Sequence, residues 1–228
     1  MPGFCRKPIV RAKKEMLTST NLIVGLTGGM GCGKSTAAAL FAERGFRRLD
    51  ADQTIRDEIL TDAAVARAVG QRLGADTLDA EGRVRRDRVA AVVFNEPAQL
   101  KWLEELLHPR LLARWRELFA AARDTAFIVE VPLLFEKGLE NWFDFIVCVT
   151  ADSATQLRRL EQRGIPPELA RQRLVKQLPL ARKCELADHV LLNDGSPEFL
   201  REQVNALADR LLNKQPLRSH DRLHVRPA

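Results

Sequence analysis

The stretch from Leu22 to Thr36 places the tightest constraint on how this 228-residue chain can fold. Its sequence is Leu-Ile-Val-Gly-Leu-Thr-Gly-Gly-Met-Gly-Cys-Gly-Lys-Ser-Thr. An apolar run of strand length comes first, a glycine-rich turn follows, and an alanine-rich segment that favours a helix comes next. The segment from Gly28 to Ser35 fits the Gly-x-x-x-x-Gly-Lys-Ser pattern of a phosphate-binding loop. The sequence therefore predicts a nucleotide phosphate site, with a plain turn between strand and helix as the alternative.

Each residue type in this loop has a physical reason to lie beside phosphate. Glycines allow the tight turns and close approach by which backbone N–H groups surround an anion. The helix that begins near Lys34 adds further N–H groups and the positive end of its dipole. Lys34 supplies a mobile charge for the β- and γ-phosphates, and the hydroxyl of Ser35 is placed to bind Mg²⁺. The residues of the loop that we expect to bind ATP are Gly29, Met30, Gly31, Cys32, Gly33, Lys34, Ser35 and Thr36.

Cys32 lies inside the loop and has two interpretations. The neighbouring N–H groups, Lys34 and the helix start all favour an anion, which would lower the pKa of the thiol and make it sensitive to oxidation. Alternatively, Cys32 is a small inert residue that points away from the phosphates into the sheet.

Acidic residues stand where two further strands are expected to end. Asp50 and Asp52 come between the segment 46–49 and a helix expected over 53–60. Ligands bind at the carboxyl ends of the strands in open α/β sheets, so one aspartate could hold Mg²⁺ or its waters and one could accept a proton from an attacking hydroxyl. Alternatively, one of them only caps the helix. Glu130 is an acidic residue inside an apolar segment. Two positions would explain it: one near Lys34 or the Mg²⁺ waters, where its charge has a partner, or an exposed one at the edge of the sheet.

The order of apolar segments and helical patterns predicts an α/β fold with a parallel sheet. Strands are expected near 22–26, 46–49, 127–131, 143–150 and 188–192. Residues 62–123 are helical by period, and Pro109 predicts that one helix ends near His108 and another spans 110–122. An arginine-rich helical pair after the fourth strand is typical of a mobile lid over a phosphate chain or of a solvated surface.

Composition argues against several classes of function. The net charge is +6, but the excess lies in residues 1–15 and 213–228, so a basic groove and a nucleic-acid partner are not expected. No apolar run is long enough to span a bilayer, so no membrane association is expected. The four cysteines are far apart and form neither a zinc motif nor a disulfide framework, which favours the cytoplasm.

Several motifs in residues 21–207 together resemble the dephospho-coenzyme A kinase family. These motifs are the loop 25–36, Asp50-Ala-Asp52, Leu107-His-Pro109, Val131-Pro-Leu-Leu-Phe-Glu136, Gln156-Leu-Arg-Arg159, Arg173-x-x-x-Gln177, Ala187-Asp188 and Asn193-Asp-Gly195. The resemblance implies a three-layer P-loop kinase core with a five-stranded parallel sheet, a helical substrate-binding insert and a helical lid. It also implies transfer of the γ-phosphate of MgATP to the ribose 3′-hydroxyl of dephospho-coenzyme A, the last step of coenzyme A synthesis.

The resemblance further implies roles for individual residues. Asp52 is the expected base, and Lys34 and Arg159 are the other expected catalytic residues. Substrate is expected to contact Asp52, His108, Pro132, Leu133 and Leu134, and the adenine to lie near Asn193 and Gly195. Cys32 departs from the small hydroxyl residue or glycine that is common in the family, and the basic tails have no counterpart.

The expected organisation is one domain, 21–212, between tails at 1–20 and 213–228. Within it we expect a core (21–61, 124–151 and 187–212), the insert (62–123) and the lid (152–186). The sequence leaves two alternatives to this function. Another small-molecule or nucleoside kinase on the same core is the first alternative. A GTPase switch, the second, would need an Asn-Lys-x-Asp motif that the sequence lacks.

Overall fold

The computed structural model describes residues 20–213. The predicted tails therefore lie outside the described residues, except for Thr20 and Asn213. The helical segments are α1 (Lys34–Glu43), α2 (Ala51–Thr54), η1 (Ile55–Ile59), α3 (Ala63–Leu73), η2 (Ala75–Thr77), α4 (Arg86–Val93), α5 (Pro97–Ala120), η3 (Glu140–Trp142), α6 (Ser153–Gln162), α7 (Pro167–Val175), α8 (Leu180–Leu186) and α9 (Pro197–Leu212).

Five parallel strands form one sheet in the order β2-β3-β1-β4-β5, which confirms the predicted fold class. Their bounds are β1 (Leu22–Gly28), β2 (Arg47–Asp50), β3 (Ala126–Glu130), β4 (Phe145–Thr150) and β5 (His189–Leu192). The register brings the carboxyl ends of the first three strands together, because Glu130 of β3 pairs with Leu26 of β1 and with Asp50 of β2. The polar residues at these strand ends therefore meet at one edge of the sheet.

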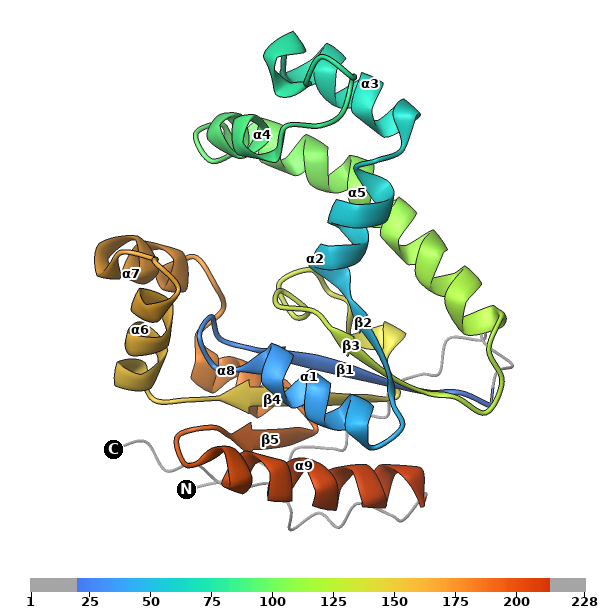
Figure 1. Ribbon diagram of the computed structural model, residues 1–228, viewed down its shortest axis with the longest axis vertical. Coiled ribbons are helices and arrows are strands. Elements are labelled where there is room, and N and C mark those ends of the chain that lie inside the picture. Colours follow the sequence, from blue (N-terminus) through green and yellow to red (C-terminus); the bar gives the residue numbers. More distant parts are fainter. Residues whose placement is uncertain (1–19, 214–228) are drawn as a thin grey trace, which may run out of the picture.

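Alternate side chains of the central strands pack on opposite faces of the sheet. On β1, Ile23 joins one apolar cluster, whereas Val24 and Leu26 join the other. Helices α1 and α9 cover the face of Val24 (Figure 1). The opposite face is covered by α8 and by the C-terminal half of α5, where the rings of Phe119 and Phe127 stack edge to face with their centroids 4.9 Å apart. The core consequently has three layers.

Two helical parts project from this core (Figure 1). One contains α3, α4 and the N-terminal half of α5, and the chain enters it from β2 through α2 and η1. The segment 53–60 was predicted as one regular helix, but η1 is a wider π-helical turn, in which the N–H of Leu60 donates to the carbonyl of Ile55 at 2.9 Å. The second part contains α6 and α7 and lies on the other side of the phosphate-binding loop.

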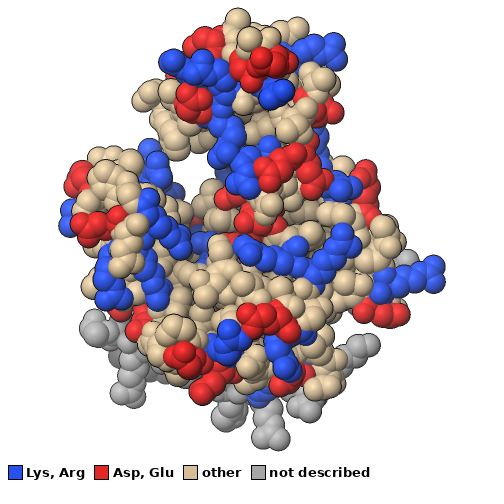
Figure 2. Space-filling view, in the orientation of Figure 1, with Lys and Arg blue, Asp and Glu red and all other residues tan. Residues whose placement is uncertain are grey.

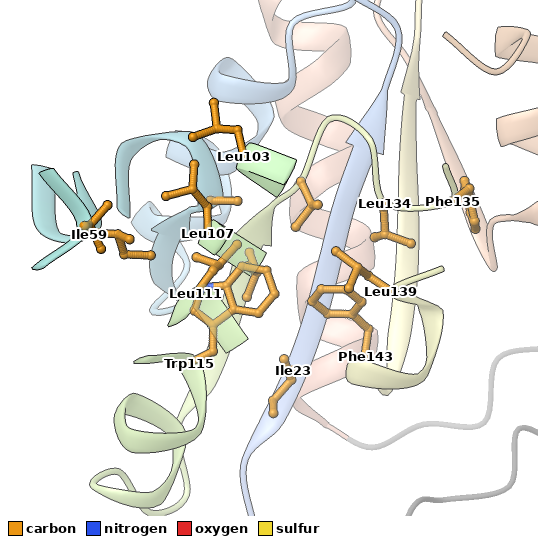
Figure 3. Packing of buried hydrophobic residues seen from close by; sticks show 14 of the residues in the cluster. Ile23, Ile59, Leu103, Leu107, Leu111, Trp115, Leu134, Phe135, Leu139 and Phe143 are labelled. Carbon is orange, nitrogen blue, oxygen red and sulfur yellow. The ribbon is translucent and has the colours of Figure 1, made fainter. Parts of the chain in front are cut away.

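The prediction that a helix ends near His108 is wrong, because α5 continues through Pro109. Pro109 itself lies on the exposed side of the helix. Apolar residues spaced by four occupy the buried side before and after it, and these are Leu103, Leu107, Leu111 and Trp115. Figure 3 shows them in a row along α5, with Trp115 beside Phe143, whose ring centroid is 6.2 Å away. This continuous packing outweighs the hydrogen bond that proline removes.

We therefore expect Pro109→Ala to stabilise the protein. Alanine restores the N–H that can bond to the carbonyl of Glu105 and removes the clash of the ring, and the exposed site loses no packing. Alanine also gives the unfolded chain more conformational freedom, which offsets part of this gain. The free energy of unfolding should therefore rise by about 1–2 kcal/mol. Urea unfolding measures it. Pro97→Ala is the control, because proline suits the first turn of α5, and no stabilisation is expected there. A loss of stability in Pro109→Ala would contradict the explanation.

Candidate active site

The phosphate-binding loop connects β1 to α1 and rests on residues from distant parts of the chain. Gly33 has a φ of 90°, and a β-carbon there would lie 2.2 Å from Nδ2 of Asn193, so only glycine fits. Asn193 donates from Nδ2 to the carbonyl of Cys32 at 2.8 Å. Gly31 lies against the backbone of Gln156 in α6. The loop is therefore held in shape by α6 and by the segment after β5.

Lys34 lies at the first position of α1 and folds back over the loop. Its Nζ donates to the carbonyls of Gly28 and Gly29 at 3.3 and 3.0 Å. Burial lowers the pKa of this ammonium, and the nearby carboxylate of Glu130 opposes that effect. The positive charge is thus held against the loop, where phosphate groups would offset the free-energy cost of burying it.

Glu130, at the end of β3, is buried and lies between two other strands, so the exposed edge position is wrong. The hydroxyl of Ser35 donates to its Oε1 at 2.8 Å. The guanidinium of Arg48 on β2 contacts Oε2 at 3.2 Å. The carboxylate therefore has the partners that a buried charge requires, and one of them is the first-turn serine of the loop motif.

The two aspartates after β2 take different positions. Asp50 caps α2, because its Oδ1 accepts from the N–H of Gln53 at 3.0 Å. Asp52 lies two residues further, in the first turn of α2, and is exposed to solvent. Protein atoms on its other sides still remove part of its hydration. This desolvation and the negative charge of Asp50 raise the pKa of Asp52, whereas the positive charge of Lys34 lowers it. The capping alternative thus applies to Asp50.

A cavity of about 330 Å³ lies beside the loop and is lined in part by Gly33 and Thr36. The expected residues Asn193 and Gly195 line it, and so does Arg159 of α6. Arg159 donates from Nη2 to the carbonyl of Asn193 at 3.0 Å and from Nη1 to that of Gly31 at 3.4 Å. Arg163, the residue that follows α6, also lines the cavity; sequence analysis placed it in the arginine-rich helical pair but not among the ATP-binding residues.

The expected substrate residues after β3 differ in exposure. Pro132 and Leu133 are half-buried, whereas the side chain of Leu134 lies wholly in the core. His108 is half-buried in α5, and burial lowers the pKa of its imidazole. It lies near Lys137, which forms a 2.7 Å ion pair with Glu104.

Cys32 follows the second of its two interpretations. Its side chain is fully buried and belongs to the apolar cluster under α1. Burial raises the pKa of the thiol by more than the charge of Lys34 lowers it. The interpretation of Cys32 as an activated thiolate is therefore wrong, and the buried, inert alternative describes this residue.

A parallel sheet of this order, with a Gly-x-x-x-x-Gly-Lys-Ser loop after β1 and a carboxylate at the end of the adjacent strand, defines a P-loop kinase. Within residues 20–213, no helix is long and apolar enough to cross a membrane. The family model for dephospho-CoA kinase matches residues 22–198. The chain belongs to the dephospho-CoA kinase family and is an ATP-dependent kinase that transfers phosphate to a hydroxyl group.

Individual relatives support this placement. The dephospho-CoA kinase of Synechococcus sp. strain CC9605 is 39% identical over 188 residues, which cover 81% of this chain and 90% of the relative. That of Geobacillus kaustophilus is 37% identical over 82% of this chain and 94% of the relative. Among solved structures, dephospho-CoA kinase from Campylobacter jejuni has a TM-score of 0.67 at 25% identity and covers 86% of this chain and 100% of its own. TT1252 from Thermus thermophilus has a TM-score of 0.70 at 34% identity, covering 84% and 98%.

The environment of Asp52 gives a prediction about its titration. In Asp50→Asn the neighbouring negative charge disappears while the cap is kept, so the pKa of Asp52 should fall. Carboxyl carbon NMR titration measures it directly. Wild-type Asp52 should titrate above the usual range of aspartate, and the variant should titrate lower. Asp62→Asn, the same change at the cap of α3, should leave Asp52 unmoved. An unchanged pKa in Asp50→Asn would show that desolvation alone sets the value.

Proposed function

We propose that the chain transfers the γ-phosphate of MgATP to the ribose 3′-hydroxyl of dephospho-coenzyme A, giving coenzyme A and ADP. The observation that carries this proposal is the convergence of Lys34, the Ser35–Glu130 pair and Asp52 at the carboxyl ends of β1, β3 and β2. One edge of the sheet then carries a positive charge for the transferring phosphate, oxygen ligands for a cation and a base for the acceptor.

The nucleotide is proposed to lie over the loop from Gly29 to Thr36. Its phosphates would accept from the loop N–H groups and meet Lys34. The cavity between Arg159, Asn193 and Gly195 would take the adenine end, because it lies directly beside Gly33 and Thr36. Arg159, which touches both Asn193 and the loop carbonyl of Gly31, would bring positive charge to the phosphate chain.

The residues at the loop also fit a Mg²⁺ ion that accompanies the nucleotide. Ser35 donates its proton to Glu130, so the lone pairs of its oxygen remain free to face a cation. Glu130 and Asp52 add carboxylate oxygens, the ligand type that Mg²⁺ prefers, either directly or through water. When bound, Mg²⁺ neutralises charge on the β- and γ-phosphates. Ser35 is the residue proposed to hold it, and Glu130 orients Ser35.

Asp52 is proposed as the base for the ribose hydroxyl. Its raised pKa makes it a better proton acceptor than an ordinary aspartate. The transition state of phosphoryl transfer is loose, so orienting the hydroxyl matters more than removing its proton early.

The acceptor is proposed to lie between the insert (62–123) and the lid (152–186). Figure 2 shows the surface hollowed between the parts that carry α3–α5 and α6–α7, with basic side chains on both sides. Such walls fit the pyrophosphate of dephospho-coenzyme A. His108, Pro132 and Leu133 would contact the acceptor, whereas Leu134 would act through its backbone, since its side chain is buried. Closure of the lid over this hollow would exclude water from the phosphate.

The direct test is consumption of ATP with and without dephospho-coenzyme A, with the position of the new phosphate determined by NMR of the product. We expect strong stimulation and a 3′-phosphate. A panel of nucleosides and small hydroxy acids is the control, because another small-molecule kinase on the same core is the main alternative. Stimulation by one of these compounds, with none by dephospho-coenzyme A, would refute the proposal.

Two variants separate the proposed roles at the reacting atoms. Lys34→Met keeps the stem but removes the charge on the phosphate, and Asp52→Asn keeps shape but removes the base. Each should lower kcat by roughly 100-fold or more. Lys34→Met should also raise the KM for ATP, whereas Asp52→Asn should leave it nearly unchanged. Asp50→Asn is the matched control for Asp52→Asn. Damage by the Asp50 change and not by the Asp52 change would show that the roles are exchanged.

A further inference from the structure

A buried ion pair close to the active site has no part in the mechanism above. Lys183 of α8 is completely buried, and its Nζ lies 2.8 Å from Oε1 of Glu136. Removing both charges from water is costly, and an apolar pair of the same volume would often be as stable. Stability alone is therefore a weak reason for these two residues to be charged.

Each member of the pair also bonds to the backbone of another segment. Lys183 donates to the carbonyl of Pro132 at 2.8 Å. Oε1 of Glu136 accepts from the N–H of Leu178 at 2.9 Å, in the chain that returns from α7 to α8. The pair thus joins two segments, the acceptor segment (132–136, after β3) and the return segment (178–183, after the arginine-rich helices).

The acceptor segment is in turn tied to the phosphate-binding loop. The carbonyl of Pro132, which Lys183 holds, also accepts from the hydroxyl of Thr27 at 3.3 Å, one residue before the loop motif. The cavity assigned to adenine has a different lining, formed mainly by α6 and by the residues after β5.

We propose that Glu136 and Lys183 are positioning residues for the phosphate acceptor. They hold the return segment, at the C-terminal end of the lid, against the acceptor segment. The lid can then approach an acceptor only when that acceptor lies correctly beside the phosphate-binding loop. The inference rests on the proposed function, which assigns the acceptor to this side of the site. It extends that function to two residues that touch neither nucleotide nor reacting atoms, and it predicts a defect in acceptor binding with ATP binding intact.

The experiment compares Glu136→Gln, Lys183→Met and the double variant in the full chain. A single change leaves one buried charge unpaired, so the single variants should melt at lower temperature. The double variant leaves no unpaired charge and nearly keeps the volume, so much of the melting temperature should return. Arg182→Met is the control, because it breaks an exposed ion pair with Glu185 on the same helix. Melting temperature, kcat and the KM values for ATP and for dephospho-coenzyme A are measured.

We expect the double variant to keep a KM for dephospho-coenzyme A raised roughly tenfold, with the KM for ATP within about twofold of wild type. The control should match wild type in every measurement. Recovery of the acceptor KM together with the melting temperature would show that the pair only supports the fold and would overturn the inference. An equal rise in both KM values would also overturn it. Failure of the wild-type chain to use dephospho-coenzyme A refutes the proposed function instead, and is recognised before any variant is compared.

Discussion

The hydrogen bond between Ser35 and the buried carboxylate of Glu130 joins the phosphate-binding loop to the sheet. A carboxylate inside a parallel sheet must be paired, and the two partners available come from α1 and from β2. Pairing therefore fixes the first turn of α1 against the end of β3. The same contact sets the direction of the serine oxygen, so one interaction meets a requirement of folding and would also serve the cation site proposed at Ser35.

Charge is distributed so that the site favours an anionic ligand. Lys34 is partly desolvated and bonds only to backbone carbonyls of the loop, and Arg159 likewise contacts carbonyl oxygens. Neither cation is neutralised by a close ion pair with a carboxylate among the described residues. Phosphate oxygens would give both cations charged acceptors in place of neutral carbonyls. The stronger hydrogen bonds would contribute to the free energy of anion binding. The pKa of Asp52, by contrast, is raised, first by desolvation and then by the negative charges of Asp50 and Glu130.

Local patterns predicted much of this arrangement, and long-range packing explains the rest. Apolar runs located four of the five strands, the short segment 46–49 located β2, and the glycine spacing located the loop, because these patterns report on backbone geometry. Pro109 led to the wrong prediction of a helix end, because the local preference of proline is outweighed by the packing of the buried side of α5. That packing exists only in the folded chain. The motif left two interpretations of Cys32 open, because the pKa of a thiol depends on how deeply it is buried, which one motif does not reveal. The Lys183–Glu136 pair joins segments 47 residues apart in sequence, so no local pattern could predict it.

The central position of β1 has a consequence for how the protein is made. This strand leaves the ribosome first among the strands, yet its neighbours are β3 and β4, and Leu22 pairs with Ala126. Residues 62–123 are therefore synthesised before β1 has any strand to bond, and the loop gains the support of Asn193 only after β5 has been synthesised. Long-range parallel pairing of this kind forms slowly and leaves apolar strands exposed during synthesis. The loop predicted to bind phosphate is thus translated well before the residues that hold it in its final shape.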